Sequence, residues 1–106
     1  MALRIETTET DGGQAIKVEG EVDLSSSPEL RTAILKATAK GKGTVAVDLS
    51  RVPYMDSSGV ATLVEGLKSV CQEGADFILV APSAAVMKVL QLSRLDTVFD
   101  LSLIHI

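Results

Sequence analysis

The chain has 106 residues, a length that fits one small domain with a single hydrophobic core. Hydrophobic residues make up 46% of the sequence but aromatic residues only 3%, so we expect an interior packed from aliphatic side chains. The formal net charge of -4 is spread over both signs without a basic run, which argues against direct binding to DNA or RNA.

The N-terminal part of the chain predicts a β-hairpin followed by a helix. Apolar and polar side chains alternate over residues 3–7, and the Asp-Gly-Gly sequence of residues 11–13 supplies a turn before a second strand over residues 15–19. That strand continues into Gly-Glu-Val-Asp-Leu at residues 20–24. The polar residues 25–29 then predict a helix start with Ser26 or Ser27 as its cap.

The central stretch predicts a buried strand that leads through a loop into a helix. Residues 45–49, Val-Ala-Val-Asp-Leu, form the strand, and an apolar stripe with helical spacing begins at Val60. Asp56, Ser57 and Ser58 lie between them, and each is a residue type that caps helices. Because the first N–H groups of a helix lack internal partners, a phosphoryl group there would be well stabilised by the domain.

The remaining elements complete an α/β pattern. Residues 76–80 predict a buried strand, Pro82 and Ser83 start a third helix, and residues 95–101 predict a last short strand. The order β-β-α-β-α-β-α-β predicts a mixed, mostly parallel sheet of four to five strands with helices packed against it. Gly66, inside the second helix, leaves two interpretations open: close packing within the domain or close approach of a partner.

Catalytic and metal chemistry are hard to assemble from this chain. Cys71 is the only cysteine and His105 the only histidine, so Cys and His alone build neither a disulfide nor a zinc site. We expect Cys71 to be a core or boundary residue. A serine hydrolase would need a base near its nucleophile and a Gly-x-Ser-x-Gly turn, which is absent. We therefore expect a protein that is not an enzyme, without cofactor or metal.

The sequence also predicts where the protein resides. No apolar run approaches the ~20 residues that a membrane-spanning helix needs. The N-terminus lacks a basic region followed by a long apolar one, which a secretion signal would have. We expect a cytoplasmic protein without membrane insertion.

One combination of motifs resembles a known family. Met-Asp-Ser-Ser-Gly-Val at residues 55–60, preceded by the strand at 45–49 and combined with Gly-Glu-Val-Asp at residues 20–23, resembles the anti-sigma factor antagonists of bacteria, whose fold is the STAS domain. The resemblance runs to about Phe99 and implies a single STAS domain over residues 1–106, with helices on one sheet face. Family members continue with one further helix, so the apolar end at residues 101–106 implies a truncated or non-native C-terminus.

The resemblance also implies a function. Such proteins bind an anti-sigma factor that is an ATP-dependent serine kinase and thereby free a sigma factor. The kinase inactivates them by phosphorylating the serine after the aspartate, here Ser57, and a PP2C-type phosphatase restores them. The phosphate is expected to act at the interface, by charge and sterics, without unfolding the domain.

The candidate partner-binding residues cluster around that serine. Alternatives stay open for two of them: Asp23 is either a partner contact or a hydrogen-bond acceptor in a turn, and Tyr54 either anchors a partner or seals the loop against the core. Met55 is a candidate apolar anchor. The full set of candidate partner contacts is Asp23, Tyr54, Met55, Asp56, Ser58 and Gly59.

A second function is compatible with the same fold. STAS domains also serve as small adaptor subunits of phospholipid-transporting ABC systems. The intact Asp-Ser-Ser-Gly motif at residues 56–59 favours the phosphorylation switch. A neighbouring gene for a kinase-like anti-sigma factor would support the switch, whereas neighbouring permease and ATPase genes would support the adaptor.

Overall fold

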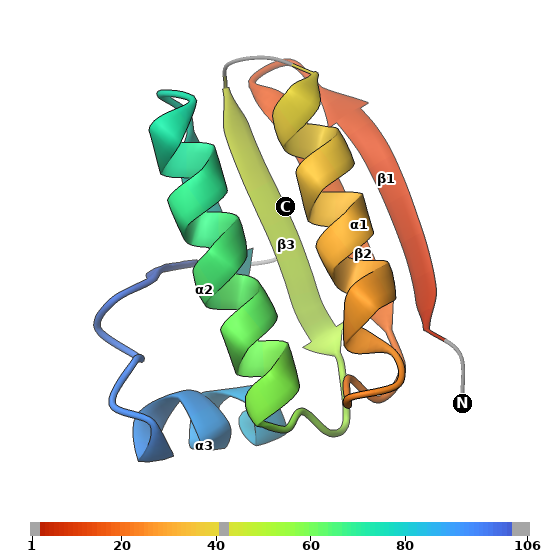
Figure 1. Cartoon of the computed structure of the whole chain (residues 1–106), viewed down its shortest axis with the longest axis vertical. Helices are drawn as coiled ribbons and strands as arrows, with labels where there is room; N and C mark the ends of the chain where they lie inside the picture. Colours follow the sequence, from red (N-terminus) through yellow and green to blue (C-terminus); the bar gives the residue numbers. More distant parts are fainter. Residues whose placement is uncertain (1–2, 41–42, 103–106) are drawn as a thin grey trace.

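The computed structural model describes residues 3–40 and 43–102 and contains the predicted succession of strands and helices (Figure 1). The order β-β-α-β-α-β-α-β is confirmed. The elements are β1 (Arg4–Thr10), β2 (Gly13–Glu19), α1 (Ser27–Ala39), β3 (Thr44–Arg51), α2 (Ser57–Gln72), β4 (Asp76–Val80), α3 (Ala84–Leu92) and β5 (Asp100–Ser102).

The five strands form one sheet in the order β1-β2-β3-β4-β5. β1 and β2 pair antiparallel as a hairpin, whereas β2, β3, β4 and β5 pair parallel, so the predicted mixed and mostly parallel sheet is confirmed. The pairing of β2 with β3 shifts register between Lys17 and Glu19, near the carboxyl ends of both strands. Because β2 and β3 are parallel neighbours, the loops that follow them leave the sheet side by side.

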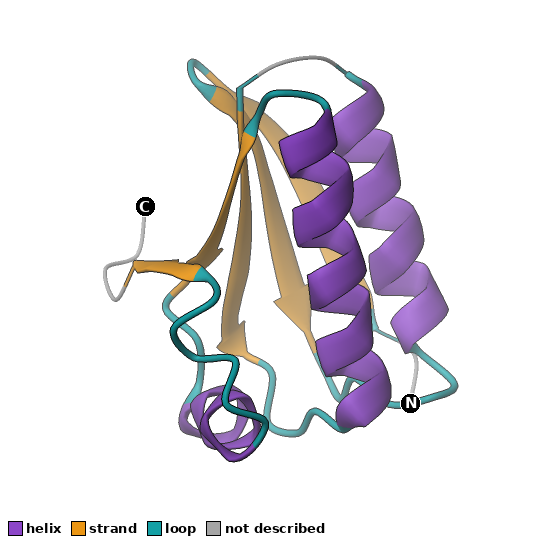
Figure 2. Ribbon diagram, turned by 60° about the vertical axis from the view of Figure 1, so that its left-hand side comes forward, coloured by secondary structure: helices purple, strands orange, loops and turns teal. Residues whose placement is uncertain are grey.

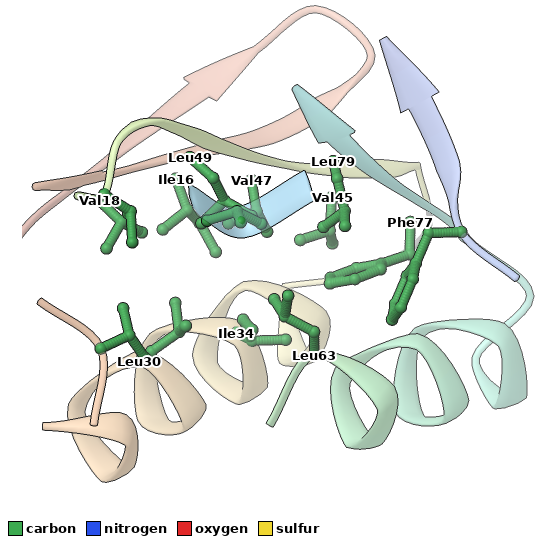
Figure 3. Close-up of a cluster of buried hydrophobic side chains, with 14 of the residues drawn as sticks. Ile16, Val18, Leu30, Ile34, Val45, Val47, Leu49, Leu63, Phe77 and Leu79 are labelled. Atoms are coloured by element: carbon green, nitrogen blue, oxygen red, sulfur yellow. The ribbon is translucent and has the colours of Figure 1, made fainter. Parts of the chain in front are cut away.

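Helices α1 and α2 lie next to each other on one face of the sheet, while α3 lies near the edge where β3 ends (Figures 1 and 2). Apolar side chains of the sheet meet those of the two helices in a largely aliphatic core, as the composition predicts (Figure 3). From the sheet come Ile16, Val18, Val45, Val47, Leu49, Phe77 and Leu79, and from the helices Leu30, Ile34 and Leu63.

Gly66 lets α1 and α2 pack closely against the sheet. A Cβ atom at this position would lie 3.0 Å from Cγ2 of Ile34 and 3.3 Å from Cζ of Phe77. Gly66 is buried, so its role is close packing within the domain, one of the two interpretations that the sequence left open.

The C-terminal part differs from the prediction. Of the described residues after α3, only Asp100–Ser102 pairs as a strand, and residues 93–99 form turns instead of the first part of that strand. The reason is local: Arg94 adopts a positive φ of 58°, and the N–H of Leu95 donates to the carbonyl of Leu90 at 2.8 Å, which closes the end of α3. Residues 103–106, on which the expectation about the C-terminus depends, lie outside the described residues.

Candidate functional site

The two loops that carry the sequence motifs are joined to each other beyond the ends of β2 and β3. Val22 and Met55 form a parallel bridge, in which the N–H of Val22 donates to the carbonyl of Tyr54 at 2.9 Å. The N–H of Asp56 in turn donates to the carbonyl of Val22 at 3.1 Å. The bridge places the motif at residues 20–23 beside the start of α2.

Asp56 caps α2. Its backbone is extended, with φ -105° and ψ -172°, and its Oδ1 accepts from the N–H of Ser58 at 2.9 Å and of Gly59 at 3.4 Å. The same oxygen accepts the Ser58 hydroxyl at 2.5 Å. Of the three capping candidates, Asp56 is therefore the cap, and its carboxylate occupies the amides that were expected to stabilise a phosphoryl group.

The two adjacent serines differ in their surroundings. Ser57 is the first residue of α2 and is exposed, and its hydroxyl makes no hydrogen bond to any residue among 3–40 and 43–102. Ser58 is half-buried, and its hydroxyl is engaged by Asp56. An exposed serine on the first turn of a capped helix has its backbone fixed in place and its side chain accessible to another protein.

Gly59 is required by the packing beneath this turn. A Cβ atom there would lie 2.6 Å from Cγ of Met55 and 2.8 Å from Cγ1 of Val22, distances that real Cβ contacts do not show. Met55 is only 4% exposed. Its side chain is a core contact under α2, so the expected surface anchor at Met55 does not agree with the structure; the residue after a proline-marked loop is pulled inward by the bridge to Val22.

Asp23 organises the start of α1. Its Oδ1 accepts the Ser25 hydroxyl at 2.7 Å and the N–H groups of Ser25 and Ser26 at 3.0 and 3.1 Å. The hydrogen bond from the Ser25 hydroxyl is the main cause that holds the pKa of Asp23 below its ordinary value, and the backbone hydrogen bonds add to it. The turn-acceptor role of Asp23 is thus visible in the structure, and a partner contact remains a proposal.

Exposed apolar side chains lie on both loops. Tyr54 is 49% exposed, and Leu24, which the sequence analysis did not select, is 78% exposed. In the sequence, the sign of this exposure is that Leu24 is an apolar residue within a run of turn-forming polar residues. A shallow groove of about 470 Å³ also begins at Ser57 and is lined by Val60, Ala61 and Val64 of α2 and by Ser93 and Leu95.

The structure also bears on the expected metal, membrane and cysteine features. Within the described ranges, no group of three or more His, Cys, Asp or Glu side chains is arranged to hold a metal ion. Among those residues, no helix is both long and apolar enough to cross a membrane. Cys71 is exposed, so the expected core or boundary position is wrong, because α2 turns it toward solvent near its last turn. His105 lies outside the described residues.

Comparisons with known proteins agree with this geometry. The family model described as "Mlab, STAS domain" matches residues 5–104. An anti-sigma-B factor antagonist of Staphylococcus aureus is 32% identical over 95 residues, which cover 90% of this chain and 88% of that protein. Both the family match and this relative extend over nearly the whole chain.

Solved structures of anti-sigma factor antagonists have a similar fold. An anti-sigma factor antagonist from Mycobacterium paratuberculosis superposes with a TM-score of 0.84 and 28% identity, covering 94% of this chain and 85% of that one. The anti-sigma factor antagonist SpoIIAA in its unphosphorylated form gives 0.75 and 26%, covering 93% and 88%. Phosphorylated SpoIIAA, a Bacillus cell fate determinant, gives 0.69 and 27%, covering 94% and 90%.

Proposed function

The chain belongs to the STAS domain family, and on that premise we propose that it is an anti-sigma factor antagonist whose activity is switched off by phosphorylation of Ser57. It acts as a regulatory protein and not as an enzyme. In its unmodified form it binds an anti-sigma factor that is also a serine kinase, and a sigma factor is released. The kinase phosphorylates Ser57, and a PP2C-type phosphatase removes the phosphate.

The observation that carries the proposal is the exposed Ser57 hydroxyl at the start of α2. A kinase must reach its acceptor hydroxyl from outside, and Ser57 meets this requirement, whereas the Ser58 hydroxyl is held by Asp56 at 2.5 Å. Two further findings support it: relatives named as antagonists, and the similarity to SpoIIAA, which exists in a phosphorylated form.

The switch acts through charge at the partner-facing surface. A phosphoryl group adds roughly -1.5 to -2 charges and three acceptor oxygens. Because the Asp56 carboxylate already accepts from the N–H groups of Ser58 and Gly59, these amides do not receive the phosphate unless the cap opens. The new charge therefore points outward, where it repels a partner surface that fits a bare hydroxyl.

The proposed contact surface surrounds Ser57. Leu24 and Tyr54 supply exposed apolar contacts from the two bridged loops, and aromatic residues are frequent among interface hot spots. Asp23, Asp56 and Ser58 form the polar part of the surface. Met55 and Gly59 contribute indirectly, because their packing fixes the position of the first turn of α2.

Phosphorylation mapping tests the proposal. The protein is incubated with a purified anti-sigma factor serine kinase from the same organism, ATP and Mg²⁺, and the product is mapped by mass spectrometry. We expect one phosphate on Ser57, none in Ser57→Ala, and one in the control Ser58→Ala. A phosphate on Ser58 with none on Ser57, or no phosphate on the wild type, would contradict the proposal.

A second candidate is an adaptor subunit of a phospholipid-transporting ABC system. The description of the matching family, "Mlab, STAS domain", does not itself name an antagonist, which keeps this candidate in place. An adaptor would bind an ABC ATPase, and neither Ser57→Ala nor Ser57→Asp would abolish that binding. Co-purification of the tagged protein with a purified ATPase, compared with the purified anti-sigma factor, separates the two candidates.

A further inference from the structure

We propose that Asp56 decides which of the two adjacent serines accepts the phosphoryl group. The inference rests on the proposed function and extends it to a residue that determines the specificity of the reaction. Ser57 and Ser58 carry the same hydroxyl one residue apart, so their chemistry alone does not distinguish them. Asp56 distinguishes them, because its Oδ1 accepts the Ser58 hydroxyl at 2.5 Å and leaves Ser57 exposed.

The chemistry of the transfer explains why this hydrogen bond matters. The lone pair of the serine oxygen forms a bond to the γ-phosphorus of ATP, and the bond from that phosphorus to the bridging oxygen breaks as ADP leaves with the electron pair. The hydroxyl proton passes to a carboxylate base of the kinase. Ser58 is half-buried, and its hydrogen bond holds the hydroxyl oxygen against Asp56, so this oxygen must leave the cap before it can meet the γ-phosphorus in the kinase. Ser57 is exposed and has no such contact to lose.

Several hydrogen bonds hold Asp56 in place, so it keeps the Ser58 hydroxyl engaged. Its Oδ1 also accepts from the N–H of Ser58 at 2.9 Å and from the N–H of Gly59 at 3.4 Å. Both Asp56 and Ser58 are half-buried, and the backbone N–H of Asp56 is held by the carbonyl of Val22 at 3.1 Å. The carboxylate therefore cannot release Ser58 by a simple side-chain rotation without losing the cap.

The same carboxylate disfavours the alternative product. A phosphate on Ser58 would replace a hydroxyl whose oxygen lies 2.5 Å from Oδ1 of Asp56, and it would bring two like charges together. Ser57 is exposed and has no hydrogen bond to Asp56. Asp56 is thus a positioning residue that acts on both the reactant and the product of the transfer.

The start of α1 offers an internal test of the principle. Ser25 is exposed like Ser57, but its hydroxyl donates to Oδ1 of Asp23 at 2.7 Å. If engagement by an aspartate protects a hydroxyl, the exposed Ser25 does not accept a phosphate in the wild-type protein.

The experiment measures the ratio of phosphate on Ser58 to phosphate on Ser57 in the wild type and in Asp56→Gly, with the kinase, ATP and Mg²⁺. Glycine is a tolerated cap that carries no acceptor side chain. We expect phosphate on Ser57 in the wild type with none detected on Ser58, and in Asp56→Gly a ratio at least roughly tenfold above the detection limit. Tenfold corresponds to about 1.4 kcal/mol, near the low end of a hydrogen bond to a charged group.

Further variants serve as controls for the loss of an aspartate, for the loss of Ser57 and for folding. The control Asp11→Gly, in the hairpin turn, keeps the wild-type ratio. The double variant Ser57→Ala/Asp56→Gly accepts phosphate on Ser58, whereas Ser57→Ala alone does not. Circular dichroism and thermal melting establish that each variant is folded, and Asp56→Asn, which retains a neutral capping oxygen, replaces Asp56→Gly if the glycine variant does not fold; it too raises the ratio above the wild-type value.

The failures of the two proposals are distinguishable. Phosphate on Ser57 alone in both the wild type and the Asp56 variant overturns this inference and leaves the proposed function intact. An Asp56 variant that is folded but accepts no phosphate also overturns it, because Asp56 would then be needed for any transfer. A wild type without phosphate overturns the proposed function and this inference together.

Discussion

The starts of α1 and α2 are two versions of the same local structure. Each follows a parallel strand, and each has an aspartate whose Oδ1 accepts backbone N–H groups and a serine hydroxyl of the next few residues. At α1 the aspartate engages the hydroxyl of Ser25, the Ser26 hydroxyl donates to the carbonyl of Glu21 at 2.8 Å, and Ser26 and Ser27 are both buried. At α2 the aspartate engages Ser58 and leaves Ser57 exposed and without a hydrogen bond within the described ranges.

The same arrangement engages the exposed serine at α1 but leaves one serine of α2 exposed, which is the residue proposed to accept the phosphate. At both starts, the hydroxyl of the serine two residues after the aspartate donates to its carboxylate. The serine directly after Asp56 makes no such bond within the described residues. Serine side chains at the start of α1 stabilise a turn, whereas the side chain of Ser57 at the start of α2 takes no part in the cap. Substitutions at the two helix starts test whether their serines and aspartates differ in this way.

The largest effect on stability is expected at Gly59, because this residue is tightly packed although Ser57 on the same turn is exposed. Gly59→Ala places a Cβ atom 2.6 Å from Cγ of Met55, and overpacking of this kind costs about 1–3 kcal/mol. Urea unfolding measures the change. Gly12→Ala is the control, since a Cβ atom there meets nothing within 4 Å. Equal stability of the two variants would contradict the packing described here.

A smaller effect is expected from Asp56→Ala, which removes the cap of α2. Loss of an N-cap side chain lowers the free energy of unfolding by about 0.5–2 kcal/mol, and the N–H groups of Ser58 and Gly59 lose their acceptor. Thermal or urea unfolding measures this change. If Asp56→Ala is as stable as the wild type, the cap is not a structural element.

The two exposed serines should respond differently to removal of the hydroxyl. Ser25→Ala removes the 2.7 Å hydrogen bond to Asp23 and is expected to lower the free energy of unfolding by about 0.5–1 kcal/mol. Ser57→Ala should change it by less than about 0.5 kcal/mol, as is usual for surface substitutions. Parallel urea titrations compare the pair, and a Ser57→Ala variant that loses as much as Ser25→Ala would refute the distinction.

The smallest effect concerns acid pH and Asp23. The folded-state pKa of Asp23 is lowered, so its contribution to stability is present above the unfolded pKa of about 3.9 and is lost as the pH falls through the folded pKa. The free energy of unfolding of the wild type should therefore decrease more steeply below roughly pH 4 than that of Asp23→Asn. Superimposable pH profiles of the two proteins would show that Asp23 is not held in this way.

Much of the fold was predictable, because it depends on local patterns. The hairpin turn at residues 11–13, the buried strands and the order of elements follow from alternation, turn residues and helical spacing. The strand expected over residues 95–101 was only partly right, because the turn that ends α3 depends on the φ of Arg94, which periodicity does not reveal.

The site was predictable only in part. The motif around Ser57 could be recognised, but the burial of Met55 and the need for Gly59 arise from contacts with Val22, which is distant in the sequence. The exposure of Leu24 and Cys71 likewise depends on how the loop and α2 are turned in the folded chain. Long-range packing of this kind has no signal in the local spacing of residues.

The proposed switch is tested by the affinity of the purified anti-sigma factor for the unmodified protein and for the protein phosphorylated at Ser57, measured by calorimetric titration. We expect phosphorylation to weaken binding by roughly 100-fold, about 2.7 kcal/mol, while circular dichroism and the melting temperature stay nearly unchanged. Equal affinities of the two forms, or a phosphorylated form that loses binding because it unfolds, would contradict the claim.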